Sequence, residues 1–369
     1  MFVQRVAIRA FRNLEQVEFE PSQGFNLIEG ENGQGKTSLL EAVGMLASLK
    51  SFRGAKNAEM IQDGHEQARL SCLLLRDGME RDLKIEVNPR SRRILLHNKP
   101  VRQLAELYGL LNLVTFVPED VGIVRGTPGE RRLFFDRMIF ASQHAYADEM
   151  ADYEEALRQR NAILRQEQPS RSLARAFESE LVRHGATVIL RRIAYADRLA
   201  PRLLATFGEI FDRELPLTAA WEGELLEPDE RPTRETLEAR FAARLDGCWS
   251  HDMARGHTTV GPHRDDLRIS LDGRDARTYA SQGQQRAAVL AFKISEIRLL
   301  EEQLGFAPIL ALDDVSSELD PQRNARLFAF LSHFQGQVFI TTTDRSFIRI
   351  DTPFRLWRMT RGHLTTESA

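Results

Sequence analysis

The chain has 369 residues, of which 42% are hydrophobic and 28% charged, and its formal net charge is −3 at pH 7. The length suffices for two domains, and the slightly negative charge argues against a globally basic nucleic-acid binder, so that any DNA-binding surface must be local. No apolar run approaches a membrane span, the first five residues do not open a signal peptide, and Cys72 and Cys248 can build neither a disulfide framework nor a zinc knuckle, so we expect a cytoplasmic protein without membrane contact.

The first predicted element is a short buried strand at residues 25–28, and the glycine-rich segment GENGQGKTS follows it at residues 30–38. This segment satisfies the phosphate-loop pattern G-x-x-x-x-G-K-[ST], in which backbone N–H groups face phosphate oxygens and a helix N-terminus adds its dipole. We expect Lys36 to reach the β- and γ-phosphates of ATP and the Thr37 hydroxyl to ligate Mg²⁺. The predicted nucleotide-binding residues are Gly30, Glu31, Asn32, Gly33, Gln34, Gly35, Lys36, Thr37 and Ser38.

A basic cluster lies further along the chain, at Arg90, Arg92 and Arg93. Residues 94–99, which follow it, have the pattern of a hairpin strand. A structural role is therefore the favoured interpretation of this cluster, and the sequence alone assigns no residue to DNA contact.

A long helical insertion separates the phosphate loop from the next motif. Apolar side chains recur at helical spacing from Tyr146 to Leu164 and again from Leu173 to Leu199, with charged residues between them. The segment Gln168–Ser170 breaks the pattern. We expect a helical hairpin with its turn near Pro169 and with arms of roughly 20 residues, which would be about 30 Å long.

The segment SQGQQR, at residues 281–286, begins a long predicted helix that ends near Leu304. Ser281 is a good N-cap, and a helix start with exposed serine and glycine also suits an anion. By itself the segment is equally well an ordinary capped helix. The candidate residues of this segment are Ser281, Gln282, Gly283 and Gln284, and the role they are given depends on the other motifs.

Two adjacent carboxylates follow a continuous apolar run at residues 309–312, which predicts a central parallel strand. Open α/β sheets bind ligands at the carboxyl ends of such strands. We expect Asp313 to hold Mg²⁺ together with Thr37, and Asp314 to polarise the attacking water; with Lys36 these are the predicted catalytic residues. The alternative is that the two aspartates merely end a strand or cap the next helix.

Read together, these motifs resemble those of ABC-type ATPases. SQGQQR resembles the signature loop that caps a nucleotide bound to a second subunit, and residues 316–320 resemble the D-loop, with Ser317 and Asp320 as its candidate residues. Further segments resemble the RecF family, which is related to the SMC proteins. They are FRNL at 11–14, SFR at 51–53, PEDVGIVRGTPGERRLFFD at 118–136 and TTVGPHRDDL at 258–267.

The resemblance covers nearly the whole chain and implies an α/β fold. We expect an ABC-type P-loop ATPase head of mixed sheets and helices, made of residues 1–124 and 213–369, with a short α-helical hairpin domain inserted at residues 125–212. The implied function is that of an ATP-driven homodimer that binds double-stranded and gapped DNA and hydrolyses ATP slowly. The family also implies RecO and RecR as partners in loading RecA during recombinational repair and replication restart.

The chain departs from the ABC-type pattern at two positions. Asp314 replaces the usual glutamate, which suggests slow turnover, and Thr343 stands where many of these ATPases have a histidine. Residues 116–120 occupy the place of their glutamine loop, without an assigned role. Two alternatives stay open: a metabolic P-loop enzyme acting on a small molecule, which has no need of SQGQQR, and a defence ATPase with a nuclease, for which no further acidic metal cluster is present.

Overall fold

The computed structural model describes residues 1–102, 107, 109–143, 145–227, 230–315, 319–350 and 352–366. The chain forms two compact units: the first contains Met1–Asp120 and Phe292–Ala369, and the second contains Val121–Ala291. The predicted hairpin domain, residues 125–212, lies within the second unit, which continues well beyond it. The prediction of one ATPase head in two halves stays a prediction. In the described ranges no helix combines the length and apolarity that crossing a membrane requires.

The first unit contains an antiparallel sheet with the strand order β2-β1-β4-β5-β6-β7. Side chains alternate between a buried and an exposed face, as the period of two requires. The hairpin strand predicted near residues 94–99 is confirmed, as β6 and β7. The strands are β1 (Phe2–Phe11), β2 (Leu14–Phe19), β4 (Ala68–Arg76), β5 (Met79–Val87), β6 (Arg92–Leu96) and β7 (Lys99–Pro100).

A second sheet of this unit has the order β15-β14-β3-β13-β12-β8, and all its pairings are parallel except that of β14 with β15. β12 and β13 are buried along their whole length, which explains their continuous apolar sequences and confirms the central parallel strand predicted at 309–312. The carboxyl ends of β3, β12 and β13 therefore meet at one edge. The strands are β3 (Phe25–Glu29), β8 (Leu113–Phe116), β12 (Ile309–Asp313), β13 (Val338–Thr342), β14 (Phe354–Thr360) and β15 (His363–Thr366).

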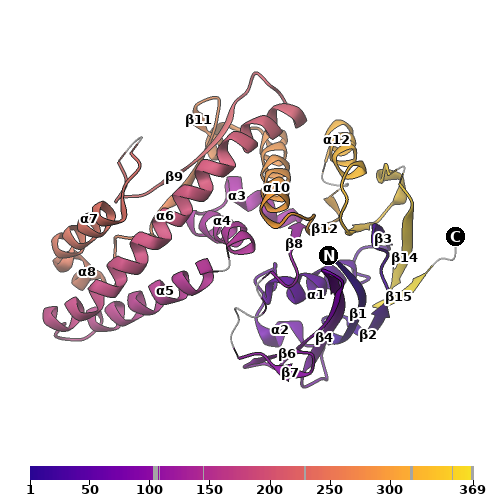
Figure 1. Ribbon diagram of the computed structural model, residues 1–369, viewed down its shortest axis with the longest axis horizontal. Coiled ribbons are helices and arrows are strands. Elements are labelled where there is room, and N and C mark those ends of the chain that lie inside the picture. Colours follow the sequence, from indigo (N-terminus) through magenta and orange to yellow (C-terminus); the bar gives the residue numbers. More distant parts are fainter. Residues whose placement is uncertain are drawn as a thin grey trace. The chain divides into compact units, whose positions relative to one another are not determined.

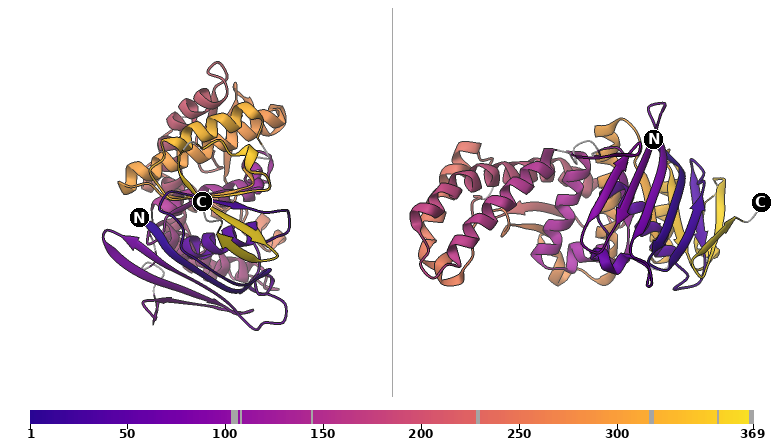
Figure 2. Two further views of the ribbon diagram at one scale, coloured as in Figure 1. Left: turned by 90° about the vertical axis from the view of Figure 1, so that its right-hand side faces the viewer. Right: turned by 90° about the horizontal axis from the view of Figure 1, so that it is seen from below.

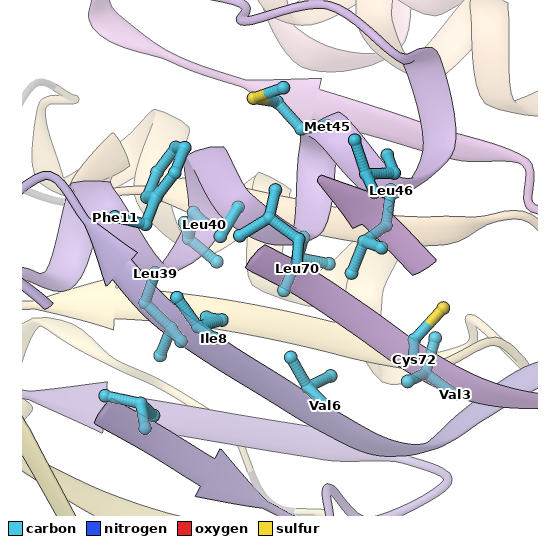
Figure 3. Close-up of a cluster of buried hydrophobic side chains, with 14 of the residues drawn as sticks. Val3, Val6, Ile8, Phe11, Leu39, Leu40, Met45, Leu46, Leu70 and Cys72 are labelled. Atoms are coloured by element: carbon cyan, nitrogen blue, oxygen red, sulfur yellow. The ribbon is translucent and has the colours of Figure 1, made fainter. Parts of the chain in front are cut away.

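Helix α1 (Lys36–Ser48) is embedded in the core of the first unit. Its Leu39, Leu40 and Met45 are almost completely buried, and Leu39 and Leu40 lie beside Ile8 of β1 and Leu70 of β4 (Figure 3). Burying each such side chain contributes roughly 1.5–3 kcal/mol, so the N-terminus of α1 is held firmly in place. The shorter elements are α2 (Asn57–Met60), η2 (Pro118–Val121), α12 (Pro321–Ser332) and η3 (Arg345–Phe347).

The second unit is built on the helical hairpin of α5 and α6 (Figure 1). The predicted turn near Pro169 is confirmed, but the second arm is 40 residues long, about twice the expected length. α6 continues through Pro201 because the apolar stripe goes on through Leu203 and Phe207, which are fully buried. The helices are α3 (Gly122–Arg125), α4 (Pro128–Ser142), α5 (Ala145–Leu164), α6 (Arg171–Ile210), α7 (Arg234–Gly247), α8 (Trp249–Arg255) and α9 (Ala276–Tyr279).

A small sheet, β11-β10-β9, packs on α6. Its strands are β9 (Leu217–Glu222), β10 (Asp266–Leu271) and β11 (Arg274–Asp275), and helix α10 (Gln282–Leu304) runs from the second unit into the first.

Within the second unit, polar contacts join residues 258–267 to α4 and α5. Arg131 donates to both carboxylate oxygens of Asp266, at 2.8 and 2.5 Å. The Nε2 of His263 lies 3.0 Å from the carbonyl of Thr258, and its Nδ1 lies 2.6 Å from the Tyr153 hydroxyl. Burial lowers the pKa of His263 to about 4, so the ring is neutral at physiological pH. These residues hold the unit together.

Candidate nucleotide-binding site

A pocket of about 750 Å³ opens in the first unit where the phosphate loop meets the carboxyl end of β12. It brings together eight of the residues predicted from sequence: Asn32, Gly33, Gly35, Lys36, Thr37, Ser38, Asp313 and Asp314. Its remaining lining was not predicted: Arg12, Asn13, Arg53, Glu59, Ile61, Gln62 and Asp63. The volume is in the range of small-molecule and cofactor sites.

The phosphate loop takes the expected course between β3 and α1. Gly33 and Gly35 have φ angles of 78° and 113°, which L-residues with side chains rarely adopt, and a Cβ on Gly35 would lie 2.9 Å from Leu14. The ammonium of Lys36 donates to the carbonyls of Gly30 and Glu31, at 2.6 and 2.9 Å. Burial lowers the pKa of Lys36, while the carboxylates of Asp314 and Asp313 oppose this shift. The cation thus lies over the loop, facing the acidic pair.

Two turns from other parts of the first unit form hydrogen bonds with the phosphate loop. Asn13, in the turn between β1 and β2, accepts a hydrogen bond from the Ser38 hydroxyl at 2.8 Å and donates to the Gly33 carbonyl at 3.2 Å. On the other side, the Gln34 carbonyl accepts from the backbone N–H of Gly362, at 2.9 Å, in the turn between β14 and β15. The asparagine of the FRNL motif therefore has a structural role, because its side chain holds the phosphate loop in place through two hydrogen bonds.

The carboxylate pair stands at the end of β12, beside Thr37. Asp313 is 5% exposed, and its Oδ1 accepts from the Thr37 hydroxyl at 3.1 Å and from the Thr341 hydroxyl at 2.8 Å. Burial raises the pKa of Asp313, and the two threonine hydrogen bonds partly offset this shift. Asp314 has a left-handed φ of 49°, and its N–H donates to Thr341 Oγ1 at 3.0 Å. One buried hydroxyl therefore binds both members of the pair.

Thr341 was not predicted; in this part of the sequence only Thr343 stood out, as the counterpart of the ABC-type histidine. Thr343 lies beyond the end of β13, whereas Thr341 lies inside it, directly opposite Asp313 in the parallel register. The available signal was a pair of threonines, Thr341 and Thr342, at the end of an apolar strand that is buried throughout. The contact between Thr341 and Asp313 could be predicted only by knowing that β12 pairs with β13, and the local sequence pattern does not show this pairing.

We expect Thr341→Val to reduce ATP hydrolysis about tenfold or more while leaving the fold intact. Valine has nearly the shape of threonine but loses both hydrogen bonds, and a hydrogen bond to a charged group contributes about 1.5–3 kcal/mol. The rate of ATP hydrolysis, measured at increasing Mg²⁺ concentrations, tests this expectation. The valine variant should need more Mg²⁺ than the parent to reach half of its maximal rate. Thr341→Ser, which keeps the hydroxyl, should restore the parent's Mg²⁺ dependence. If the valine variant required no more Mg²⁺ than the parent, Thr341 would not be needed to position Asp313 for Mg²⁺.

The donor set at the carboxylate pair suits Mg²⁺. The Thr37 hydroxyl and the Asp313 carboxylate are hard oxygen ligands, and they are already in contact with each other. In the part of the chain that the structure describes, no cluster of three or more His, Cys, Asp or Glu side chains could hold a metal alone. Mg²⁺ often binds through one or two protein groups and takes its other ligands from water and phosphates, so these two residues fit it.

The SFR motif and Arg12 meet at the buried carboxylate of Glu41, which is fully inaccessible to solvent. Arg12 donates to both of its oxygens, at 3.0 and 2.8 Å, and the Ser51 hydroxyl donates to it at 2.5 Å. Losing one partner of such a buried charge typically costs about 3–5 kcal/mol. This network fixes the segment that carries Arg53 beside the pocket.

Residues 116–120 form the end of β8 and most of the short helix η2. The Asp120 carboxylate accepts from the Val117 N–H at 2.9 Å and forms an ion pair with the buried Lys293 at 3.5 Å. Asp120 thus fastens this segment to α10. The segment stands where ABC-type ATPases have their glutamine loop, but it contains no glutamine.

The signature-like segment belongs to the second unit. Ser281 Oγ accepts from the Gln284 N–H at 3.2 Å, and Gln284 Oε1 accepts from the Ser281 N–H at 2.7 Å, which is a capping box. None of the described residues that line the pocket comes from 281–286. The predicted D-loop residue Ser317 lies outside the described residues, and Asp320 caps α12 by accepting from two backbone N–H groups.

Comparisons with known proteins agree with this geometry. The family model described as RecF/RecN/SMC N terminal domain matches residues 2–364. The chain is 42% identical over 348 residues to the DNA replication and repair protein RecF of Myxococcus xanthus (strain DK1622), covering 93% of this chain and 90% of that protein. It is 44% identical over 349 residues to the RecF of Anaeromyxobacter sp. (strain Fw109-5), covering 93% and 92%.

Solved structures give the same result. The structure of the recombination mediator protein RecF-ATPrS in the RecFOR pathway superposes with a TM-score of 0.91 at 30% identity, covering 100% of this chain and 98% of that one. The Smc head domain from Pyrococcus furiosus superposes with a TM-score of 0.57 at 14% identity, covering 100% and 96%, which shows likeness of fold alone. The predicted fold class, an α/β ABC-type ATPase head with an inserted helical hairpin, is confirmed.

Proposed function

The chain belongs to the RecF family of SMC-related DNA replication and repair proteins, and on this basis we propose that it is an ATP-dependent DNA-binding protein of recombinational repair and replication restart. One observation carries the proposal most directly. The phosphate loop and the carboxylate pair share one pocket, which is lined by residues of the first unit. In the ABC-type ATPases that this chain resembles, a signature segment of a second subunit caps such a site. We therefore propose that a second copy of the chain completes the site.

Each residue of the half-site has a chemical role in this proposal. Lys36 and the loop N–H groups bind the β- and γ-phosphates of ATP, as in other phosphate loops. Thr37 and Asp313 would hold Mg²⁺, which would neutralise phosphate charge. Asp314 orients the attacking water and accepts its proton.

The partner copy supplies its signature segment, Ser281 to Gln284, to the γ-phosphate, and Ser317 and Asp320 take the D-loop role that the family resemblance implies. Two such sites in a head-to-head dimer follow from two-fold symmetry, since each copy gives a pocket and receives a cap. We propose that ATP thereby closes the dimer on DNA and that slow hydrolysis reopens it.

The substrate and partners are proposed from the family. A relative of this chain is described as a recombination mediator in the RecFOR pathway. We propose that the dimer binds double-stranded DNA at gaps and junctions with single strands, and that it works with RecO and RecR in loading RecA. A cytoplasmic location fits this role.

ATP-dependent binding to a gapped duplex tests the proposal. Fluorescence anisotropy with ATP, with ADP and without nucleotide should show tight binding only with ATP, and the same DNA should stimulate hydrolysis. Equal binding in all three conditions would contradict the proposal that ATP closes the dimer on DNA. Phosphate transfer to a metabolite, with no effect of DNA, would instead indicate a small-molecule P-loop enzyme.

We expect Asp314→Asn to trap the closed dimer. Asparagine keeps the size of the side chain but cannot accept a proton, so the rate of hydrolysis should fall at least about a hundredfold, in the range of general-base effects. ATP binding should persist, because the ligands of Mg²⁺ are unchanged. Single-turnover hydrolysis and the lifetime of the ATP-bound dimer measure this, and turnover at the normal rate would remove Asp314 from the chemistry.

A further inference from the structure

The antiparallel sheet of the first unit carries a row of arginines across neighbouring strands. The register places Arg9 of β1 directly opposite Arg69 of β4. Arg69 in turn lies opposite Glu86 of β5, and Glu86 lies opposite Arg93 of β6. Residues paired in this way share one face of a sheet, so these side chains form a single line, which we call the arginine row.

The arginine row lies on the outer face of the sheet. The residues next to it along the strands, Ile8 and Leu70, are 0% and 1% exposed and pack into the core with α1. Because side chains alternate along a strand, Arg9 and Arg69 point the other way, and both are exposed. Figure 2 (right) shows the strands of this sheet from below, as broad indigo and violet ribbons.

The positive charge of this row is only partly compensated. Glu86 lies 3.8 Å from Arg93, but among the described residues no carboxylate lies within 4.0 Å of Arg9 or Arg69. The Gln67 amide lies beside Arg69, and with its oxygen and nitrogen exchanged its oxygen accepts from the Arg69 guanidinium. Like charges directly opposite each other on neighbouring strands are destabilising. Folding therefore gives no reason for an arginine at both positions.

Other arginines near this sheet have local explanations. Arg5, on the same strand as Arg9, is paired with Glu18, and its Nε donates to that carboxylate at 2.6 Å. Arg92 is half-buried, and its Nε donates to Asn57 at 2.8 Å. The structural interpretation of the basic cluster at 90–93 thus suits Arg92, whereas Arg93 belongs to the arginine row and Arg90 is exposed in the adjacent turn.

We propose that the arginine row binds the phosphate backbone of duplex DNA, which makes this face of the first unit a DNA-contacting surface. The inference rests on the proposed function. Strands lie about 4.8 Å apart, so the row from β1 to β6 spans roughly 14 Å, and duplex DNA presents one charge per about 1.7 Å of its axis. Guanidinium groups bind phosphate through paired hydrogen bonds. A row on an open sheet face suits the backbone, so binding through it is independent of base sequence.

The salt dependence of DNA binding tests this surface. Arg9→Gln and Arg69→Gln each remove one phosphate contact, so each should lower the slope of log K against log salt by about 0.9 and weaken binding about eightfold at about 0.1 M salt. Arg5→Gln is the matched control, since it removes the same charge from the same sheet, and it should leave the slope unchanged. Anisotropy on a labelled duplex with ATP, over about 50–200 mM salt, gives these values.

Two further readouts separate DNA contact from a structural effect. ATP binding should be unchanged in both variants, because neither residue lines the pocket. Thermal stability should be equal or slightly higher, because a repulsion is removed. Unaltered DNA binding in both variants, or an equal loss in Arg5→Gln, would show that the arginine row does not bind DNA. The proposed function would be unaffected by that result. Failure of the parent chain to bind DNA at all would overturn the proposed function and this inference with it.

Discussion

Lys36→Ala is expected to abolish ATP binding at micromolar concentration and, with it, every ATP-dependent state of the protein. Lys36 lies over the phosphate loop, where its ammonium is held by the carbonyls of Gly30 and Glu31. When phosphate is present, this cation supplies charge-assisted hydrogen bonds of about 1.5–3 kcal/mol each. Losing two of them should weaken binding at least about a hundredfold, which corresponds to about 3 kcal/mol. Isothermal titration with ATP and Mg²⁺ measures the loss.

Lys50→Ala is the matched control for this variant. Lys50 is exposed, lies just beyond the C-terminal end of α1 and does not line the pocket, so ATP affinity should be unchanged. Lys36→Ala should also unfold at nearly the parent temperature, because burial already disfavours its charged form in the free protein. Tight ATP binding by Lys36→Ala would refute the assignment of this loop as the phosphate site.

Ser281→Arg is expected to separate ATP binding from dimer formation. Ser281 is exposed at the start of α10, outside the pocket. In the proposed dimer it approaches the γ-phosphate of the partner, where an arginine is too large. The variant should therefore bind ATP with the parent affinity as a monomer, while the ATP-dependent dimer weakens at least about a hundredfold and DNA binding is lost with it. Titration calorimetry and sedimentation velocity measure the two properties separately.

Ser281→Ala serves as the control for the fold. It loses the N-cap hydrogen bond, which costs about 1 kcal/mol, but adds no bulk at the proposed interface. It should therefore dimerise far better than the arginine variant at similar thermal stability. If Ser281→Arg formed the ATP-dependent dimer as readily as the parent, the segment could not cap a partner's nucleotide.

Most of the architecture was predictable because its signals are local. The phosphate-loop pattern, the apolar strand before the carboxylate pair and the break near Pro169 each stand within a short stretch of sequence. The structure has a strand, a helix or a turn at each of these places. The length of α6 was underestimated because the apolar pattern was followed only to Leu199, whereas the buried stripe continues through Leu203 and Phe207.

The unpredicted parts of the site depend on contacts between distant segments. Thr341 reaches Asp313 only because β12 and β13 are paired in one particular register. Asn13 and Gly362 reach the phosphate loop from opposite ends of the chain, through turns whose positions follow from sheet topology. The arginine row likewise exists only in the folded sheet. Patterns along the sequence carry no information about which strand becomes a neighbour.

The central claim is that one copy of this chain holds only part of a working ATP site and that a second copy supplies the rest. Sedimentation velocity at high protein concentration, with Mg²⁺ and duplex DNA and with or without ATP, tests it most directly. We expect a monomer without nucleotide and a dimer with ATP, most clearly in Asp314→Asn. A species that remains monomeric when its pocket is saturated with ATP and DNA is present would contradict it.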